Sequence, residues 1–423
     1  MNSPHLVVIG CGFAGLELIK HLNKSPYRIT VLDKNNYFNF QPLMYQVASG
    51  GLGPDAIAYP LRKIISKMPN VTFRMAEVLE VDLKNNTVKT TVGDIPFDYL
   101  CIATGAKTNF FGNKVLETHC MQLKSIPDAL DIRSDILQEL EKALSETDTG
   151  KIKRILNFVI VGGGPTGVET AGALAEIKNH VIPADYKELD PSLMQVYLIE
   201  ASHRVLSAMS EISSAKAEEY LKELGVNVLT NTSVTAYDPS SGILTLSDGS
   251  VVETDTVIWT AGVMGKTLEG IDTHYIAKGN RYKVDAFNRL EGFENVFVIG
   301  DLAYMTADEA YPNGHPMVAT VAQQQGRALA KNLLRKLKNK PLTPFKYFNK
   351  GSMATVGRHK AVVEIGKIKI QGYLAWFGWM FLHLMYIVGF RNRTVVFVNW
   401  LWNYFTYQRA IRLIIRPFRQ NVS

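Results

Sequence analysis

The sequence feature that most constrains the fold is a glycine-rich turn that follows an apolar strand and occurs twice. In the first copy, the apolar residues 6–9 lead directly into GCGFAG at 10–15. Residues 16–22 suit a helix, and residues 29–32 suit a second strand that ends at Asp33. A strand, a G-x-G-x-x-G turn, a helix and a strand that ends in an acid are typical of a dinucleotide-binding βαβ unit.

Each glycine of the first turn has a physical reason. Gly10 permits the tight connection from strand to helix, Gly12 lets a pyrophosphate approach the backbone, and Gly15 lets the helix pack closely on the strand. We expect the phosphate to rest on the free N–H groups at the N-terminus of the helix. Asp33 is then placed to accept hydrogen bonds from ribose hydroxyl groups.

The second copy begins with the apolar residues 156–161 and continues as GGGPTG at 162–167. A helix over 171–177 and a strand over 195–199 follow, and Glu200 ends that strand. Two dinucleotide sites in one chain predict one permanently bound and one exchangeable nucleotide.

The choice of nucleotide at the second site follows from charge. A carboxylate at Glu200 repels the 2′-phosphate of NADPH, so we expect NADH to be preferred. Arg204 is the only nearby residue that favours the opposite choice.

Composition excludes several other classes of protein. With 47% hydrophobic and 20% charged residues over 423 positions, the chain can bury two or three cores and is not disordered. Its three cysteines form no C-x-x-C pair, which argues against a disulfide scaffold, a cysteine-bound metal or cluster, and a short-spaced redox dithiol. No metal site is expected. The first ten residues lack a signal-peptide pattern, so we expect the chain to begin in the cytoplasm.

The C-terminal tail differs from the rest of the chain in charge. No acidic residue follows Glu364, whereas eight Lys and Arg residues do, so the tail carries all of the net charge of +7. Residues 372–390 contain no Asp, Glu, Lys or Arg and are long enough for a transmembrane helix. Trp376 and Trp379 within this stretch instead favour the membrane–water interface.

A second pattern in the tail also favours an interfacial helix. One predicted helical face is basic and the neighbouring face is apolar, which is typical of a helix on anionic lipids. The basic face has Arg409, Arg412 and Arg416, and the apolar face has Tyr404, Tyr407, Ile411, Ile414 and Ile415, with Leu413 as the misfit and Pro417 as the helix end. The alternative is a face that binds a partner protein or forms a homodimer. The bulky aliphatic neighbours argue against nucleic acid.

These features, in this order, resemble the two-dinucleotide flavoprotein reductases, which bind FAD at the first motif and NAD(P)H at the second. Several segments more narrowly resemble type II NADH dehydrogenases, also called NADH:quinone oxidoreductases. They are NFQPLMYQVASG (39–50), GGGPTGVE (162–169), WTAGV (259–263), VIGDLA (298–303), VATVAQQQG (318–326), KGSMATVGR (350–358) and the tail LAWFGWMFLHLMYIVGFRNR. The resemblance covers nearly the whole chain.

The resemblance implies functional residues at matching positions. For FAD these are Gly10, Gly12, Phe13, Ala14, Gly15, Asp33, Val78, Thr104, Gly105, Asp301 and Ala322. For NADH they are Gly162, Gly163, Gly164, Gly167, Glu200, Ala261 and Gly262. Catalytic roles are implied for Glu169, Gln324 and Lys350.

Three observations qualify the catalytic set. The dipole of the second helix is an equally good structural reason for Glu169. Thr320 stands where the first glutamine of the family's AQxAxQ pattern often stands, so the first polar contact to a quinone is not expected from a glutamine. For Lys350, the alternative to a catalytic role is an ordinary surface lysine.

The expected fold is α/β, with two Rossmann-like domains, the second inserted in the first, and a C-terminal membrane-associating helical region. We place an FAD-binding domain at 1–115 and 285–345, an NADH-binding domain at 116–284 and the membrane-anchoring region at 346–423. The highly charged residues 138–154 are interpreted as an exposed connection.

The expected function is that of a monotopic flavoenzyme at the cytoplasmic face of the inner membrane. It would pass a hydride from NADH to FAD and two electrons to a membrane quinone, without proton pumping, on an anionic lipid surface. The alternatives are a soluble NADH-dependent reductase of an iron–sulfur carrier and an NADH sensor without turnover. Disulfide reductases and sulfide:quinone oxidoreductases need cysteines that this chain lacks.

Overall fold

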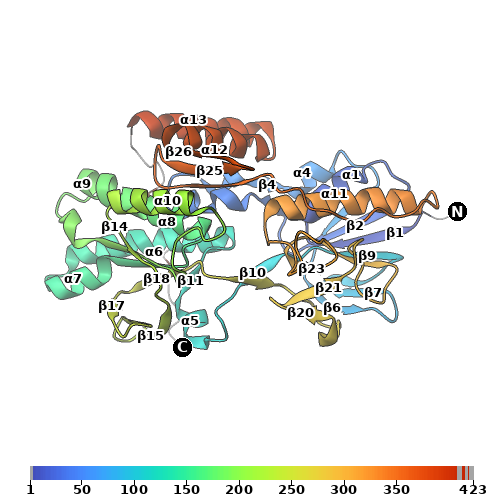
Figure 1. Cartoon of the computed structure of the whole chain (residues 1–423), viewed down its shortest axis with the longest axis horizontal. Coiled ribbons are helices and arrows are strands. Elements are labelled where there is room, and N and C mark those ends of the chain that lie inside the picture. Colours follow the sequence, from blue (N-terminus) through green and yellow to red (C-terminus); the bar gives the residue numbers. More distant parts are fainter. Residues whose placement is uncertain (1–2, 407–411, 415–417, 419–423) are drawn as a thin grey trace. The chain divides into compact units, whose positions relative to one another are not determined.

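The structure, a computed structural model, describes residues 3–406, 412–414 and 418 (Figure 1). The chain divides into two compact units. The first comprises Met1–Phe38, Tyr59–Lys107 and Val263–Lys350, and the second comprises Asn39–Ala58, Thr108–Gly262 and Gly351–Ser423. The chain leaves the first unit at residue 107 and returns to it at 263, which is the topology expected of one domain inserted in another.

The first unit is built on a parallel five-stranded sheet. In spatial order its strands are β22 (Val296–Val298), β9 (Tyr99–Ile102), β1 (His5–Ile9), β2 (Arg28–Asp33) and β5 (Val71–Met75). All of β1 is buried, because its apolar run is covered on both faces. Helices α1 (Phe13–His21) and α11 (Ala319–Lys336) pack closely, since a Cβ at Gly326 would collide with the carbonyl oxygen of Ala14.

The second unit repeats this arrangement. In spatial order the strands of its parallel sheet are β11 (Met121–Gln122), β18 (Thr256–Trp259), β12 (Asn157–Val161), β13 (Gln195–Ile199) and β14 (Val226–Leu229). In both sheets the central strand, β1 or β12, runs into the glycine turn and the next helix. That helix is α8 (Pro165–Glu176) in the second unit. The prediction of two Rossmann-like domains is confirmed.

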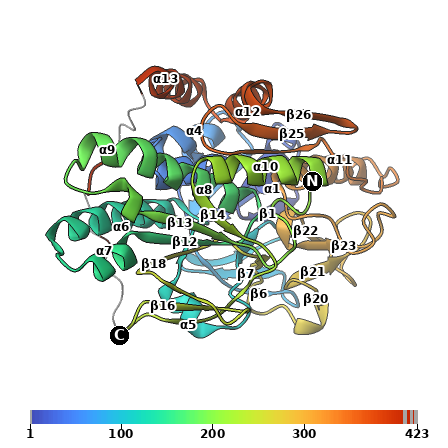
Figure 2. The ribbon, with the colours of Figure 1, turned by 60° about the vertical axis from the view of Figure 1, so that its left-hand side comes forward.

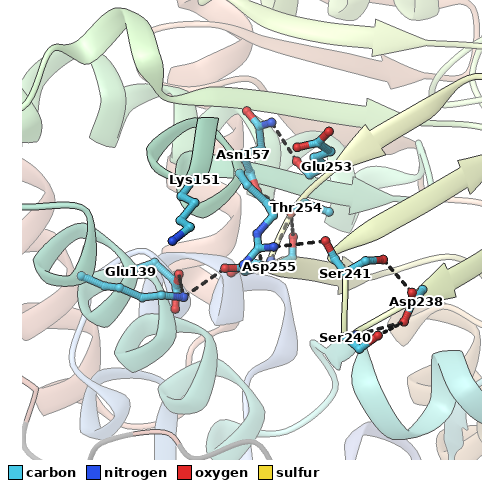
Figure 3. A network of polar contacts seen from close by, with 12 residues as sticks. Glu139, Lys151, Asn157, Asp238, Ser240, Ser241, Glu253, Thr254 and Asp255 are labelled. Carbon is cyan, nitrogen blue, oxygen red and sulfur yellow. Dashed lines mark hydrogen bonds and ion pairs between the residues drawn. The ribbon is translucent and has the colours of Figure 1, made fainter. Parts of the chain in front are cut away.

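Residues 138–154 are largely exposed, as their charge suggested, but they are mostly helical. They form the end of α6 (Ile126–Ser145) and most of α7 (Thr149–Leu156), which are fastened to residues 241–255 by a polar network (Figure 3). Lys142 and Arg154 both pair with Asp255 at 3.0 Å, and Arg154 donates to the carbonyl oxygen of Ser241. Lys142 and Arg154 thus hold the two helices against residues 241–255, while most of the other charged side chains remain in solvent.

The C-terminal region is part of the second unit. It consists of β24 (Ser352–Thr355), β25 (Ala361–Ile365), β26 (Ile368–Gln371), α12 (Gly372–Tyr386) and α13 (Phe390–Thr406) (Figure 2). Trp379, Ile387 and Val396 are buried. The side-chain amide of Asn392 donates to the carbonyl oxygens of Asp55, Ala56 and Ala58. Removing this region would therefore open the core of the unit.

The two units group the chain differently from the division drawn on the sequence. Residues 263–284 pack with the first unit, where Ile271, Tyr282 and Val284 enter its core. Residues 39–58 and 351–423 group with the second unit.

The uncharged stretch 372–390 is not one helix. Helix α12 ends at Tyr386, and the chain turns through Gly389, with φ of +89°, before α13 begins. Within residues 3–406, 412–414 and 418, no helix combines the length and apolar character needed to cross a bilayer.

The predicted basic helix near the C-terminus is only partly described. Residues 412–414 have no regular structure, and Arg412 forms an ion pair with Asp185, so this arginine does not belong to a helical lipid-binding face. Helix α13 ends at Thr406. The other members of the predicted faces that lie outside the described residues are Tyr407, Arg409, Ile411, Ile415, Arg416 and Pro417.

Candidate functional site

The first glycine turn contains glycines of two physical kinds. Gly10 has φ of +95°, and a Cβ there would collide with the backbone of Ala103, while a Cβ at Gly15 would collide with the carbonyl oxygen of Gly10. Gly12 has φ of −74°, and no atom lies within 4 Å of its Cβ position. Gly10 and Gly15 are therefore required by packing, whereas Gly12 faces open space.

The N-terminus of α1 is ready to bind an anion. Gly12 is its N-cap, and no side chain caps the free N–H groups of the first turn. Asp33 accepts the N–H of Cys11 through Oδ2 at 2.8 Å and the N–H of Asn35 through Oδ1 at 2.9 Å. Burial raises the pKa of Asp33, and these two N–H groups oppose the rise. The open space and the uncapped helix end fit a dinucleotide phosphate.

Three of the predicted FAD residues lie together around Gly300. The Cβ position of Gly300 is 3.3 Å from the Cβ of Ala14 and 3.6 Å from the Cβ of Ala322. Gln325 accepts the N–H of Gly300 at 2.7 Å, while its own Nε2 is buried without a partner. The turn that carries Asp301 is thereby held next to the N-terminal turns of α1 and α11.

Two residues that the sequence analysis did not predict support this turn. One is Gln325, one position after the predicted Gln324. The other is the buried Arg281, whose Nη2 donates to the carbonyl oxygen of Ala303 and whose charge interacts with Asp301. Neither belongs to a recognisable motif, so only the fold reveals them.

The remaining FAD candidates are less tightly grouped. Thr104, next to the close contact of Gly10 with Ala103, donates to the carbonyl oxygen of Lys266 at 2.6 Å, and Gly105 follows with φ of +71°. Phe13 packs edge-on against Phe38. Val78 begins β6 (Val78–Asp82) of a separate three-stranded sheet.

The second glycine turn repeats the first position by position. Gly162, with φ of +109°, approaches the backbone of Ala261, and Gly167 approaches the carbonyl oxygen of Gly162. Gly164 is the N-cap of α8, has φ of −71° and again has no atom within 4 Å of its Cβ position. Gly162, Gly164 and Gly167 thus match Gly10, Gly12 and Gly15.

The acid of the second site also matches the first. Glu200 accepts the N–H of Gly163 through Oε2 at 2.5 Å and the N–H of Ser202 through Oε1 at 2.7 Å. Gly262 has φ of +72° and lies close to the ring of Phe111. The structure therefore brings together all seven residues predicted for NADH.

Two predicted catalytic residues lie in the first unit. The side-chain amide of Gln324 donates to the carbonyl oxygen of Phe348 at 2.9 Å and accepts the Phe348 N–H at 3.0 Å. These two bonds fix the orientation of the amide. Thr320, in place of the family's first glutamine, shares a hydrogen bond of 2.8 Å with the Tyr347 hydroxyl. Lys350 is exposed and lies outside any helix or strand.

Glu169 is buried in α8, and its carboxyl faces the C-terminal region of the second unit. Burial raises its pKa to about 8, so the carboxyl is mostly protonated at neutral pH. The Thr355 N–H, 3.4 Å from Oε1, opposes the rise. The buried indole N–H of Trp379 interacts with the carboxyl and also lowers its pKa.

A hydrogen-bonded chain connects the surroundings of Glu169 to a pocket. The Tyr45 hydroxyl lies 3.0 Å from Oγ1 of Thr355 and accepts a hydrogen bond from Nε2 of Gln46 at 2.9 Å. Oε1 of Gln46 in turn accepts the indole N–H of Trp400 at 2.8 Å. The resemblance in sequence covers residues 39–50 as a segment but does not indicate Tyr45 or Gln46 individually.

The pocket itself lies within the second unit and has a volume of about 100 Å³. Its walls come from α12, α13, α8 and the segment 45–51. Among the side chains that line it are Gln46, Glu176, Arg358, Trp376, Trp400 and Tyr404. It combines aromatic walls with a few polar groups, which is typical of a site for a small, mostly apolar molecule.

Within the described residues, no three His, Cys, Asp or Glu side chains are grouped closely enough to bind a metal. All three cysteines are buried and unpaired, and burial raises the pKa of each thiol.

Comparisons with known proteins agree with this geometry. Residues 4–326 match the family model of the pyridine nucleotide-disulphide oxidoreductases, and residues 349–407 match the model of the NDH2 C-terminal domain. A type II NADH:quinone oxidoreductase of Mycobacterium tuberculosis is 38% identical, over 93% of this chain and 86% of its own length. Another, from Haemophilus influenzae, is 30% identical over 90% and 93%.

The fold is shared with a solved structure. NDH2 of Plasmodium falciparum, in complex with NADH, aligns with a TM-score of 0.89 and 21% identity over 98% of this chain and all of that one. Together, the two family models and the similarity over nearly the whole length place this chain in the pyridine nucleotide-disulphide oxidoreductase family, and within it among the type II NADH:quinone oxidoreductases.

Proposed function

We propose that this protein oxidises NADH and reduces a membrane quinone through bound FAD, so that NADH, one proton and a quinone give NAD⁺ and a quinol. The observation that carries the proposal is the repeated turn, because both copies combine an uncapped helix N-terminus with one glycine that faces open space. The test is steady-state NADH oxidation by the flavin-loaded protein with and without quinone. An NADH sensor would show no turnover with any acceptor.

FAD belongs to the first turn. Gly12 leaves room for the pyrophosphate, the N-terminus of α1 supplies N–H donors, and Asp33 keeps the turn in shape through its bond to the Cys11 N–H. When bound, FAD supplies the redox chemistry by accepting a hydride and releasing two electrons. The other proposed contacts are Gly10, Phe13, Ala14, Gly15, Val78, Thr104, Gly105, Asp301 and Ala322.

The cysteines support quinone rather than disulfide chemistry. A disulfide reductase needs a pair of reactive thiols, and reactive thiols have lowered pKa values. Here burial raises the pKa of all three, that of Cys120 to about 12, and none is paired with another.

NADH belongs to the second turn, where Glu200 sets the preference over NADPH. We expect Glu200→Gln to reduce the NADH/NADPH ratio of kcat/KM by roughly 5- to 150-fold, which corresponds to about 1–3 kcal/mol, because one charge repulsion of the 2′-phosphate is removed. The measurement is kcat/KM for both nucleotides with the same acceptor.

The same change also disturbs the turn, because a glutamine can accept only one of the two N–H bonds that Glu200 accepts. KM should therefore rise for NADH too, and the ratio is the diagnostic quantity. An unchanged ratio would assign the preference to another residue, and Arg204 would then be the next candidate.

Glu169 is proposed to act at the nicotinamide side as a protonated carboxyl. Its raised pKa also makes a prediction about stability. The folded protein keeps a proton that the unfolded chain releases above the ordinary glutamate pKa of 4.5, so the Glu169 contribution makes the free energy of unfolding fall as pH rises from about 4.5 to about 8. Above about pH 8 both states are ionised and the loss is complete.

Glu169→Gln removes this loss. We expect the variant to gain stability relative to the natural protein by up to about 4 kcal/mol between pH 5 and pH 8. Denaturant unfolding of both proteins at the two pH values measures it, with the exposed Glu117→Gln as the matched control. Parallel pH dependences of the natural and variant proteins would show that Glu169 is ionised throughout.

The protein is proposed to attach to the cytoplasmic face of the membrane through α12 and α13. Each helix buries one side and exposes an apolar stripe. On α12 the exposed residues include Leu374, Phe377, Phe381 and Met385, and on α13 they include Phe390, Phe397, Val398, Leu401 and Trp402. We call these residues the apolar face. Exposed apolar side chains gathered on two neighbouring helices are typical of a membrane or protein interaction site.

Charge favours lipid as the partner of the apolar face. Arg391 and Arg393 lie at the start of α13, where Arg391 is 3.7 Å from Asp55 and Arg393 donates to the carbonyl oxygens of Met385 and Ile387. No Asp or Glu follows Glu364 in the sequence, so Lys and Arg exceed acidic residues in this region. Apolar side chains next to an excess of cations suit an anionic lipid surface. A lipid-soluble quinone would be met at the same surface.

A further inference from the structure

The hairpin of β25 and β26 has an apolar face that becomes more exposed toward its tip. The cross-strand pairs on this face are Val363 with Ile370 and Ile365 with Ile368, closed by the turn Gly366–Lys367. Val363 is 4% exposed, Ile370 38%, Ile365 51% and Ile368 63%. The hairpin tip, residues 365–368, therefore presents two adjacent isoleucines to solvent.

The opposite face of the hairpin is already occupied. Glu364 accepts hydrogen bonds from the backbone N–H of Ser210, from the Ser210 hydroxyl and from the Ser213 hydroxyl, at the start of α10 (Glu211–Glu223). Lys369 is its cross-strand partner. Because Glu364 fixes this face to α10, the isoleucine face must point away from α10. Figure 2 shows the hairpin beside α12.

We propose that the hairpin tip is a second membrane-inserting element, which places Ile365 and Ile368 among the acyl chains and Lys367, in the turn beside them, at anionic headgroups. The inference rests on the proposed membrane attachment of α12. That helix packs on β25 and β26, so the tip continues the apolar face. Lysines that flank exposed aliphatic side chains can reach the headgroups while their stems stay in apolar surroundings.

Size argues against a second copy of the chain as the occupant. A stable protein interface buries about 800 Å² on each partner. The hairpin tip by itself cannot supply such an area, so a second copy would have to cover the apolar face of α12 and α13 as well, whereas a bilayer requires no minimum patch.

The chain's own cysteines make a direct test practical. Cys11, Cys101 and Cys120 are buried, so a cysteine introduced at the surface is the one that a thiol-reactive fluorophore labels. We would label Ile368→Cys in the full-length holoenzyme and add vesicles of phosphatidylcholine and phosphatidylglycerol with brominated acyl chains. The matched labels are Leu374→Cys on α12 and Val251→Cys, an exposed valine of β17 (Val251–Glu253).

We expect brominated lipid to quench the labels at 368 and 374 but not the label at 251. Quenching at 374 alone would overturn the insertion of the hairpin and leave the attachment by α12 intact. No quenching at either position would refute the attachment itself. A blue shift of the fluorescence emission of the label at 368 that depends on protein concentration and not on vesicles would show that a second copy of the chain, and not lipid, covers the hairpin tip.

The lysines provide an independent measurement. Lys367→Gln should weaken binding to phosphatidylglycerol vesicles about fivefold, because a cation near an anionic surface contributes about 1 kcal/mol. Lys369→Gln is the matched control, because Lys369 lies opposite Glu364 on the face that is held against α10. The loss in Lys367→Gln should disappear at high salt. Equal binding of the natural and Lys367→Gln proteins at low salt would contradict a headgroup contact.

Discussion

Gly12→Val is expected to give a folded protein that contains no flavin. The protein itself leaves room for the change, because φ at Gly12 is −74° and no atom lies within 4 Å of its Cβ position. Valine is a poorer N-cap than glycine, which costs about 1 kcal/mol. The new side chain instead occupies the space that the pyrophosphate needs in front of the N-terminus of α1.

The expected loss of FAD affinity is large. A phosphate at a helix N-terminus accepts charge-assisted hydrogen bonds, each of which contributes about 1.5–3 kcal/mol. Losing two of them weakens binding by on the order of 100-fold or more. The flavin absorbance of the purified protein, relative to protein concentration, measures this directly, and circular dichroism checks the fold.

The repeated turn supplies matched controls. Gly164→Val makes the same change at the equivalent open position, with φ of −71°, so it should keep the flavin and raise KM for NADH steeply. Gly15→Val should fail to fold, since its Cβ would collide with the carbonyl oxygen of Gly10. Full flavin content in Gly12→Val, or flavin loss in Gly164→Val, would overturn the assignment of the two turns.

Sequence patterns predict most where the constraint is local. A glycine turn between a buried strand and a helix specifies its own geometry, and both sheets form around these turns as expected, with β1 and β12 as central strands. Asp33 and Glu200 can be predicted from their position alone. Each ends the strand that pairs in parallel with the central strand, β2 with β1 and β13 with β12, so each lies beside the glycine turn that follows the central strand.

Long-range contacts are not predictable in this way. Nothing in the local sequence indicates that Glu169 is buried against Thr355 and Trp379, or that Gln325 rather than Gln324 supports Gly300. The charged residues 138–154 are largely exposed as predicted, but the ion pairs of Lys142 and Arg154 with the distant Asp255 could not be predicted from the local sequence. The uncharged stretch 372–390 does not form one helix, because the chain breaks at residues 387–389, where Gly389 with φ of +89° is the local signal.

The tail's packing also decides how its role should be tested. Deletion of residues 365–423 would remove the buried Trp379, Ile387 and Val396 together with the bonds of Asn392, so a loss of activity would report unfolding of the second unit. Substitutions on the apolar face avoid this, because its side chains contribute little to the core.

The triple change Leu374→Ser, Phe381→Ser and Phe397→Ser is therefore expected to release the protein from the membrane while leaving it folded and flavin-loaded. These side chains are 75%, 69% and 49% exposed. Full burial of a Leu or Phe side chain contributes about 1.5–3 kcal/mol, so even partial burial of three should make vesicle binding weaker by about 100-fold or more. Cosedimentation with vesicles of phosphatidylcholine and phosphatidylglycerol measures the loss.

The triple variant should also keep one activity and lose another. NADH oxidation with a small soluble acceptor should be unchanged, because neither glycine turn is altered, whereas reduction of a long-chain quinone in vesicles should fall with binding. The matched control replaces three exposed aliphatic residues elsewhere in the second unit, Ile212, Ile243 and Val251, by serine, and should bind vesicles normally. Normal vesicle binding by the α12–α13 variant would refute the apolar face as the attachment surface. Normal quinone reduction without binding would instead show that the quinone reaches the flavin from water.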